Sequence, residues 1–117
     1  MTEFVDFLGE VFRNFGSVQA RKMFSGYGLY HEGVMFGLVA DEMLYLKVDQ
    51  TTARYFEVKS LSQFEYSRKG KVIKMSYYQA PEEIFDDSEE AAKWARLAFE
   101  VAFRSKKRTK KATSEQE

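Results

Sequence analysis

The sequence contains a single histidine, His31, in the turn-like run His31-Glu32-Gly33, where we expect an exposed side chain. A zinc site needs several nitrogen or thiolate ligands at a suitable spacing, and the chain has no cysteine. A catalytic triad needs a nucleophile and a carboxylate placed on either side of the imidazole, and one turn histidine does not define these partners. Asp41 and Glu42 are paired carboxylates, but adjacent acids are ordinary turn residues. We therefore predict no catalytic residue, no metal ligand and no cofactor.

The run Ser25-Gly26-Tyr27-Gly28 contains a Gly-x-Gly pattern that resembles part of a phosphate-binding loop. It lacks the third glycine of a dinucleotide loop and the Gly-Lys-Ser/Thr end of a P-loop. No alternation of strands and helices typical of a parallel sheet follows it. We expect these glycines to mark a bulge, a bend or a close backbone crossing in a strand.

Basic side chains form two groups that could contact nucleic acid. The candidate contacts are Arg104, Lys106, Lys107, Arg108, Lys110 and Lys111 near the C-terminus, with Arg68 and Lys69 in a predicted hairpin turn. Lys71, Lys74, Tyr66 and Tyr78 lie near the second group, and interleaved cations and aromatic rings are typical of a stacking surface. A solvated hairpin tip and a solvated tail explain the same residues equally well.

Length and composition indicate one domain with a substantial core. The chain has 117 residues, of which 44% are hydrophobic and 16% are aromatic, and its formal net charge is zero. The N-terminus lacks the features of a signal peptide, and no apolar run approaches the length of a membrane span. The absence of cysteine fits a reducing compartment, so we predict a cytoplasmic protein without membrane contact.

An apolar stretch over residues 23–48 organises the chain. The turns 31–33 and 41–42 divide it into three runs, which predicts an antiparallel meander. In the middle run the alternation assigns Val34, Phe36, Leu38 and Ala40 to one face and Met35, Gly37 and Val39 to the other. A second hairpin is predicted from strands at 63–66 and 71–78, and residues 18–23 are interpreted as a connector.

Helices are predicted at both ends of the chain. Residues 3–15 form an amphipathic pattern that could cover the sheet or bind a partner, with Thr2 as the cap. Asp49 to Thr52 can cap a short helix that ends near Val58. Pro81 begins a small helix, and Asp87 or Ser88 caps a longer one that ends at about Lys107. The fold class is therefore α+β, with one antiparallel sheet of about five strands, a domain over residues 1–105, and a disordered basic and polar tail over 106–117.

Several blocks of this sequence resemble the N-terminal domain of the TfoX/Sxy family of bacterial competence regulators. The blocks are residues 21–30, 33–40, 44–49 and 75–82, followed by an acidic stretch and a helix rich in tryptophan and alanine. The residues expected to carry this structural motif are Met23, Phe24, Gly26, Tyr27, Gly28, Tyr30, Tyr77 and Pro81. Ser25 departs from the family, which more often has glycine there. The resemblance covers the N-terminal domain, so we expect a stand-alone domain without the second, helical domain of the competence regulators.

The resemblance implies a non-enzymatic α+β module that regulates transcription of DNA-uptake genes through protein contact. The implied partners are the cyclic-AMP receptor protein at its promoters or the RNA polymerase machinery, with weak DNA contact from the basic tail. A self-associating or chaperone-like domain, such as a homodimer without a nucleic-acid role, is the alternative. A small enzyme would require a pocket that gathers Tyr27, His31 or Tyr78 with a carboxylate.

Overall fold

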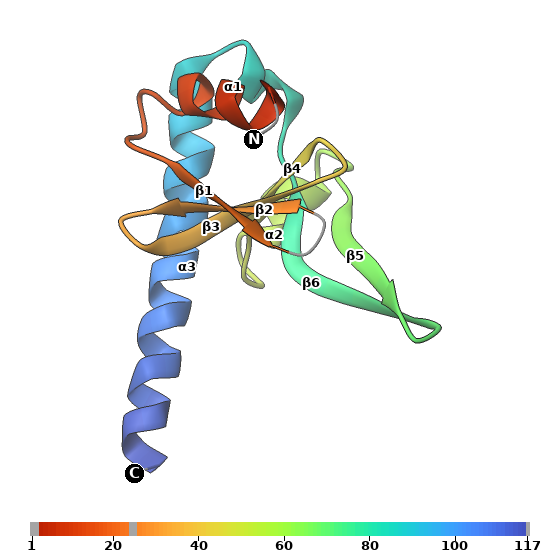
Figure 1. Ribbon diagram of the computed structural model, residues 1–117, viewed down its shortest axis with the longest axis vertical. Coiled ribbons are helices and arrows are strands. Elements are labelled where there is room, and N and C mark those ends of the chain that lie inside the picture. The colour runs from red at the N-terminus through yellow and green to blue at the C-terminus, as the bar shows by residue number, and fades with distance from the viewer. Residues whose placement is uncertain (1–2, 24–25, 117) are drawn as a thin grey trace.

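The computed structural model describes the backbone of residues 3–23 and 26–116, and side chains as far as residue 107. Three α-helices, one 3₁₀ helix and six strands make up this part of the chain (Figure 1). In order they are α1 Glu3–Val11, β1 Gln19–Met23, β2 Gly26–His31, β3 Val34–Ala40, β4 Met43–Lys47, α2 Ala53–Glu57, β5 Gln63–Arg68, β6 Lys71–Gln79, η1 Glu82–Phe85 and α3 Ser88–Gln116.

All six strands join one antiparallel sheet in the order β1-β2-β3-β4-β6-β5. The predicted α+β class, the meander and the second hairpin are confirmed. The sheet has one strand more than expected, because residues 19–23 pair with β2 instead of forming a connector. Three of the hairpin turns place both central residues at positive φ, as right-twisted strands require: Glu32 and Gly33, Asp41 and Glu42, and Lys69 and Gly70.

A bulge between β2 and β3 overturns the predicted alternation in the middle strand. Leu29 pairs with Gly37 but Tyr30 pairs with Met35, so Phe36 is an extra residue on β3. Val34 and Phe36 consequently share the helix-covered face with Val39, and all three belong to the main core. Leu38 lies on the opposite face, beside Tyr45 of β4.

The helices supply the other half of the main core. Leu8 and Phe12, at the end of α1 and just beyond it, are fully buried, and the ring of Phe12 meets that of Phe36 edge-on at 5.8 Å. Trp94 of α3 packs edge-on against Phe56 of α2, with ring centroids 4.9 Å apart. Each described helix thus directs its buried side chains toward the same face of the sheet, and α3 passes behind the strands in Figure 1.

Local polar contacts explain where two of the helices begin. Asp49 Oδ1 accepts a hydrogen bond from the backbone N–H of Thr52, and Asp87 Oδ1 accepts from the N–H groups of Glu89 and Glu90. The predicted capping roles of Asp49 and Asp87 are therefore confirmed. Pro81 precedes η1 and is fully buried.

The last helix is longer than the sequence predicts. The helix α3 continues to Gln116, past the expected end at about Lys107 and through a segment for which a disordered tail was expected. Residues 88–116 contain neither glycine nor proline, so no residue in this segment breaks the helical backbone. The division of the chain at residue 105 stays a prediction.

Candidate interaction surfaces

His31 is not the exposed turn residue that the sequence predicts. Its side chain is 15% exposed, and its Nδ1 donates to the carbonyl oxygen of Ser17 at 2.7 Å. The imidazole lies 4.5 Å from the ring of Phe15 and 5.0 Å from the ring of Phe99. Because His31 pairs with Val34 across the hairpin, it faces the helices, where its ring fills the edge of the core.

The glycines of the Gly-x-Gly run are places of close packing. A Cβ at Gly26 would lie 2.0 Å from the carbonyl oxygen of Val39, and one at Gly28 would meet the sulfur atoms of Met23 and Met35. This confirms the predicted close backbone crossing. Of the expected motif residues, Tyr27 packs against the core and Met23 lies half-buried, while Phe24 lies outside the described residues.

The side chains expected of an enzyme pocket do not come together. Tyr27 and His31 lie on β2, whereas Tyr78 lies on β6 and is separated from β2 by two further strands. The Tyr78 hydroxyl instead donates to Glu57 at 2.8 Å, and this hydrogen bond raises the pKa of Tyr78. Among the described residues, no group of three or more His, Asp or Glu side chains could hold a metal ion.

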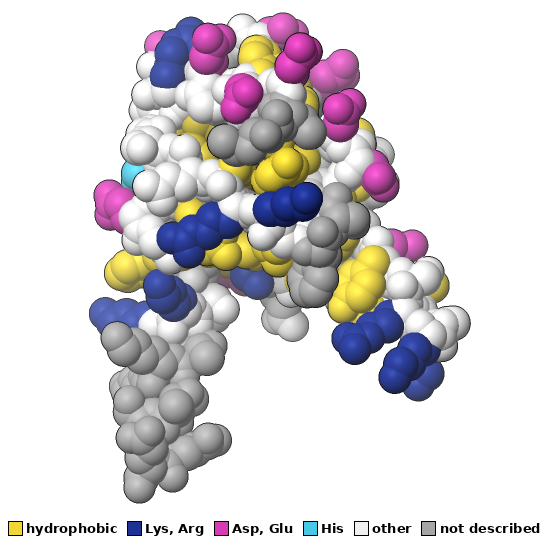
Figure 2. Space-filling view, in the orientation of Figure 1, with side chains coloured by type: hydrophobic (Ala, Val, Ile, Leu, Met, Phe, Trp, Pro, Cys, Tyr) yellow, Lys and Arg dark blue, Asp and Glu magenta, His cyan; other side chains and the backbone are white. Residues whose placement is uncertain are grey.

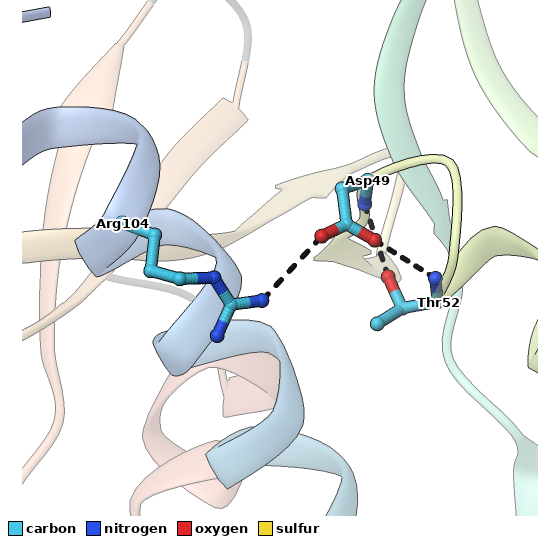
Figure 3. A network of polar contacts seen from close by, with 3 residues as sticks. All are labelled: Asp49, Thr52 and Arg104. Carbon is cyan, nitrogen blue, oxygen red and sulfur yellow. Dashed lines mark hydrogen bonds and ion pairs between the residues drawn. The ribbon is translucent and has the colours of Figure 1, made fainter. Parts of the chain in front are cut away.

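The predicted nucleic-acid contacts differ in how free their side chains are. Arg104 Nη2 donates to Asp49 Oδ2 at 3.4 Å (Figure 3). Lys106 Nζ donates to the carbonyl oxygen of Gly33 at 3.2 Å. Arg68 and Lys69 are exposed at the tip of the β5–β6 hairpin, and Lys107 is exposed on α3. The side chains of Arg108, Lys110 and Lys111 lie outside the described part of the chain. Nucleic-acid contact by this group stays a prediction.

Charge is separated between two ends of the molecule. Asp and Glu gather around α1 and η1 at the top of Figure 2, whereas Lys and Arg gather lower down, by the hairpin tip and α3. The order of acidic and basic residues in the last fifty positions of the sequence already indicates this separation of charge. A chain of zero net charge can therefore present one face to a negatively charged partner.

The face of the sheet opposite the helices forms a second candidate surface, which we call the open face. The strand pairs assign eighteen residues to it, and alternation along β5 and β6 adds Phe64 and Met75. The twenty residues are Gln19, Arg21, Met23, Gly26, Gly28, Tyr30, Met35, Leu38, Ala40, Met43, Tyr45, Lys47, Phe64, Tyr66, Arg68, Lys71, Ile73, Met75, Tyr77 and Gln79. Leu38 and Tyr77 are each 7% exposed, so neighbouring side chains of this face bury its centre. No helix in the described ranges packs its buried residues here.

The open face carries a row of aromatic rings and, beside other rings, two cations. Tyr45 and Phe64 lie 4.9 Å apart and Phe64 and Tyr66 lie 6.3 Å apart, which makes a continuous row over β4 and β5. The Arg21 guanidinium lies 4.6 Å from the Tyr30 ring, and Lys47 Nζ lies 5.1 Å from the Tyr77 ring. Burial lowers the pKa of Lys47. Burial, with a smaller effect from Tyr30, raises the pKa of Tyr77 to about 12.

Sequence reasoning did not find the open face as a unit. It noted that Tyr66 and Tyr78 lie near the basic hairpin turn. The register separates these two rings, because Tyr66 pairs with Ile73 on the open face whereas Tyr78 pairs with Leu46 on the helix-covered face. Only the pairing between strands brings Tyr45, Phe64 and Tyr66 into one row.

A groove of about 600 Å³ separates α2 from α3. Tyr55, Val58, Trp94 and Leu97 line it, and Lys59, Lys93, Arg96 and Glu100 complete the lining. Val58 is 81% exposed and Tyr55 is 52% exposed, which is unusual for large apolar side chains that have a core available. The groove therefore combines an apolar surface with mainly positive charge.

Comparison with known proteins identifies a family match. The TfoX N-terminal domain matches residues 10–102. The chain belongs to the TfoX N-terminal domain family. It is 22% identical to Protein Sxy of Escherichia coli over 97 residues, which cover 83% of this chain and 46% of that protein. It is 33% identical to DNA transformation protein TfoX1 of Aliivibrio fischeri over 79 residues, which cover 64% of this chain and 38% of that protein.

This TfoX N-terminal domain thus spans less than half the length of the curated relatives that it matches. The recognised blocks fall on the meander and on the segment from β6 to α3, which confirms the family resemblance. No helix in the part of the chain that the structure describes is both long and apolar enough to cross a membrane.

Proposed function

We propose that this TfoX N-terminal domain is a non-enzymatic regulatory module that acts by protein contact at the promoters of DNA-uptake genes. The observation that carries the proposal is its homology to the competence proteins Sxy and TfoX1. The proposed partner is the cyclic-AMP receptor protein, with the RNA polymerase machinery as the next candidate. Promoter DNA lies in the bacterial cytoplasm, where this chain would also act.

The groove between α2 and α3 is the proposed contact for that partner. Tyr55 and Val58 expose apolar surface beside Lys93 and Arg96, a combination that suits an acidic protein surface with one apolar side chain at its centre. The basic end of the molecule would add salt-sensitive DNA affinity without sequence preference.

A gel-shift titration with the receptor protein, its promoter DNA and this chain tests the proposal. We expect a slower complex that forms only when all three components are present. Val58→Asp should weaken it, whereas the matched control Val72→Asp changes a valine that is 61% exposed and lies outside the groove. No ternary complex with either the receptor protein or RNA polymerase would contradict the proposed role.

Self-association is the second candidate, because the sheet ends in two edge strands, β1 and β5. Edge strands expose backbone N–H and C=O groups that can pair with a second copy. Sedimentation at low and high salt distinguishes the two functions: a salt-insensitive dimer that binds no promoter complex would favour self-association.

A further inference from the structure

We propose that the open face binds single-stranded nucleic acid by stacking bases on the row Tyr45, Phe64 and Tyr66. This site goes beyond the proposed function and does not depend on it, because the groove that would contact a protein lies on the helix-covered side. The observation behind it is the arrangement of rings and cations that strand pairing produces. This observation depends on neither the family match nor the basic tail.

The ring geometry fits stacked bases. Tyr66 is 40% exposed, and Phe64 and Tyr45 are half-buried, so each ring is held by neighbours yet keeps surface free. The Phe64 and Tyr66 rings are inclined by only 31° with their centroids 6.3 Å apart, so a base can lie on each of them. Tyr45 meets Phe64 edge-on, at 63° and 4.9 Å, and borders this pair at the end of the row. Aromatic side chains on an open β-sheet accept every base, because each base has a flat π surface.

The charge of the open face selects an anionic ligand. Its twenty positions include four cations and no carboxylate: the cations are Arg21, Lys47, Arg68 and Lys71. Arg68 and Lys71 are a directly opposed pair at the hairpin tip, two residues along their strands from Tyr66 and Ile73. Like charges placed opposite each other destabilise a hairpin, and a phosphate between them would relieve that repulsion.

The same arrangement favours a single strand over the two other ligands that could cover this face. Duplex DNA hides its bases from a stacking surface, so it would use the cations but leave the ring row without a partner. An acidic peptide would satisfy the cations but would bring few flat groups for three consecutive rings. Stacking and charge are used together only by unpaired nucleotides.

Fluorescence anisotropy with a labelled oligothymidylate of about 12 nucleotides, against the matched duplex, tests the proposal directly. We expect the single strand to bind more tightly than the duplex. Tyr66→Ala should weaken single-strand binding at least about fivefold, whereas Tyr66→Phe keeps the ring and should retain it. Phe7→Ala is the matched control, because Phe7 is 43% exposed but lies on α1, away from both the open face and the groove.

The charged residues give an independent measurement. Arg68→Ala should reduce the slope of log affinity against log salt by about 0.7, the value for one phosphate contact to a single strand. Arg13→Ala removes an exposed cation just after α1, outside the open face and the groove, and should leave the slope unchanged. Fluorescence of Trp94, which is buried on the helix-covered side, verifies that each variant is folded.

Three results would overturn the proposal. They are equal affinity for single strand and duplex, unchanged affinity for the single strand in folded Tyr66→Ala, and displacement of the oligonucleotide by a polyglutamate peptide that binds as tightly as the oligonucleotide. The last result would identify an acidic protein as the ligand of this face. Failure here leaves the gel-shift result with Val58→Asp unaffected, so the two proposals are tested separately.

Discussion

Asp49 links the beginning of α2 to α3, and its removal should destabilise the fold measurably (Figure 3). Its Oδ1 accepts from the Thr52 N–H at 2.8 Å, while the Asp49 N–H donates to Thr52 Oγ1 at 3.0 Å. Thr52 is 4% exposed, so water could not readily replace the lost acceptor. We expect Asp49→Ala to lower the free energy of unfolding by about 1–2 kcal/mol.

The ion pair with Arg104 should contribute much less than the cap. The Arg104 side chain is 53% exposed, and its contact with Asp49 Oδ2 is 3.4 Å long. Exposed pairs of this kind contribute between zero and about 1 kcal/mol. Arg104→Ala should therefore cost at most about 0.5 kcal/mol, and Asp49→Asn, which keeps an acceptor oxygen for Thr52, should fall between the two alanine variants.

Urea unfolding followed by Trp94 fluorescence measures these differences, because Trp94 packs on Phe56 of α2. The hydrogen bond from the Thr52 N–H, with further help from Arg104, holds the pKa of Asp49 below its ordinary value. A carboxyl with a lowered folded pKa stabilises the fold above its ordinary pKa, and that stability is lost as pH falls through the folded pKa. The gap between the native protein and Asp49→Asn should consequently close in acid. An Arg104→Ala variant as unstable as Asp49→Ala would refute the assignment to the cap.

Four further substitutions follow from the backbone and the open face. Gly26→Ala should destabilise the fold by about 3 kcal/mol or more, because its Cβ would meet the Val39 carbonyl oxygen at 2.0 Å. Gly9→Ala has open space on α1 and should stabilise the fold by about 0.5–1 kcal/mol. Thermal melting compares the two variants. Glu42→Gly should stabilise by about 1 kcal/mol, since Glu42 has a φ of 58°, and urea titration measures the gain. Tyr77 should ionise at about pH 12 in an absorbance titration. The stability that neutral Tyr77 contributes is complete below the ordinary tyrosine pKa and should decline as the pH rises from there through the folded pKa. Tyr77→Phe should remove this pH dependence.

The helices and the meander could be predicted because they follow from local patterns. Apolar periodicity located α1, although the helix ends at Val11 and not at the predicted residue 15. Turn residues at 31–33, 41–42 and 67–70 located the hairpins. The caps Asp49 and Asp87 were predictable because a capping side chain bonds to backbone two or three residues away. Each of these features depends on contacts within a few residues of sequence.

Features that depend on pairing between strands were not predictable in the same way. One extra residue, Phe36, exchanges the faces of everything before it on β3. Gly37 beside it is a residue type that often marks a bulge, but a glycine alone does not say whether the register shifts there. Gln19–Met23 contains two adjacent cations and lacks alternation, so its pairing with β2 gives no sequence signal. His31 was misplaced for a related reason, since the hairpin register turns it inward.

The helix-covered face of the sheet holds the core that stabilises this domain, whereas no helix of the described residues covers the open face, which could bind a ligand. The main core receives α1, α2, α3 and one face of the sheet, so substitutions there should act first on folding. The open face keeps its own small buried centre at Leu38 and Tyr77, which holds the surrounding rings in place without a covering helix. A ring at the exposed end of this face, such as Tyr66, can consequently be removed at little cost to stability. Loss of ligand affinity in such a variant, at unchanged stability, is therefore interpretable as loss of contact and not of fold.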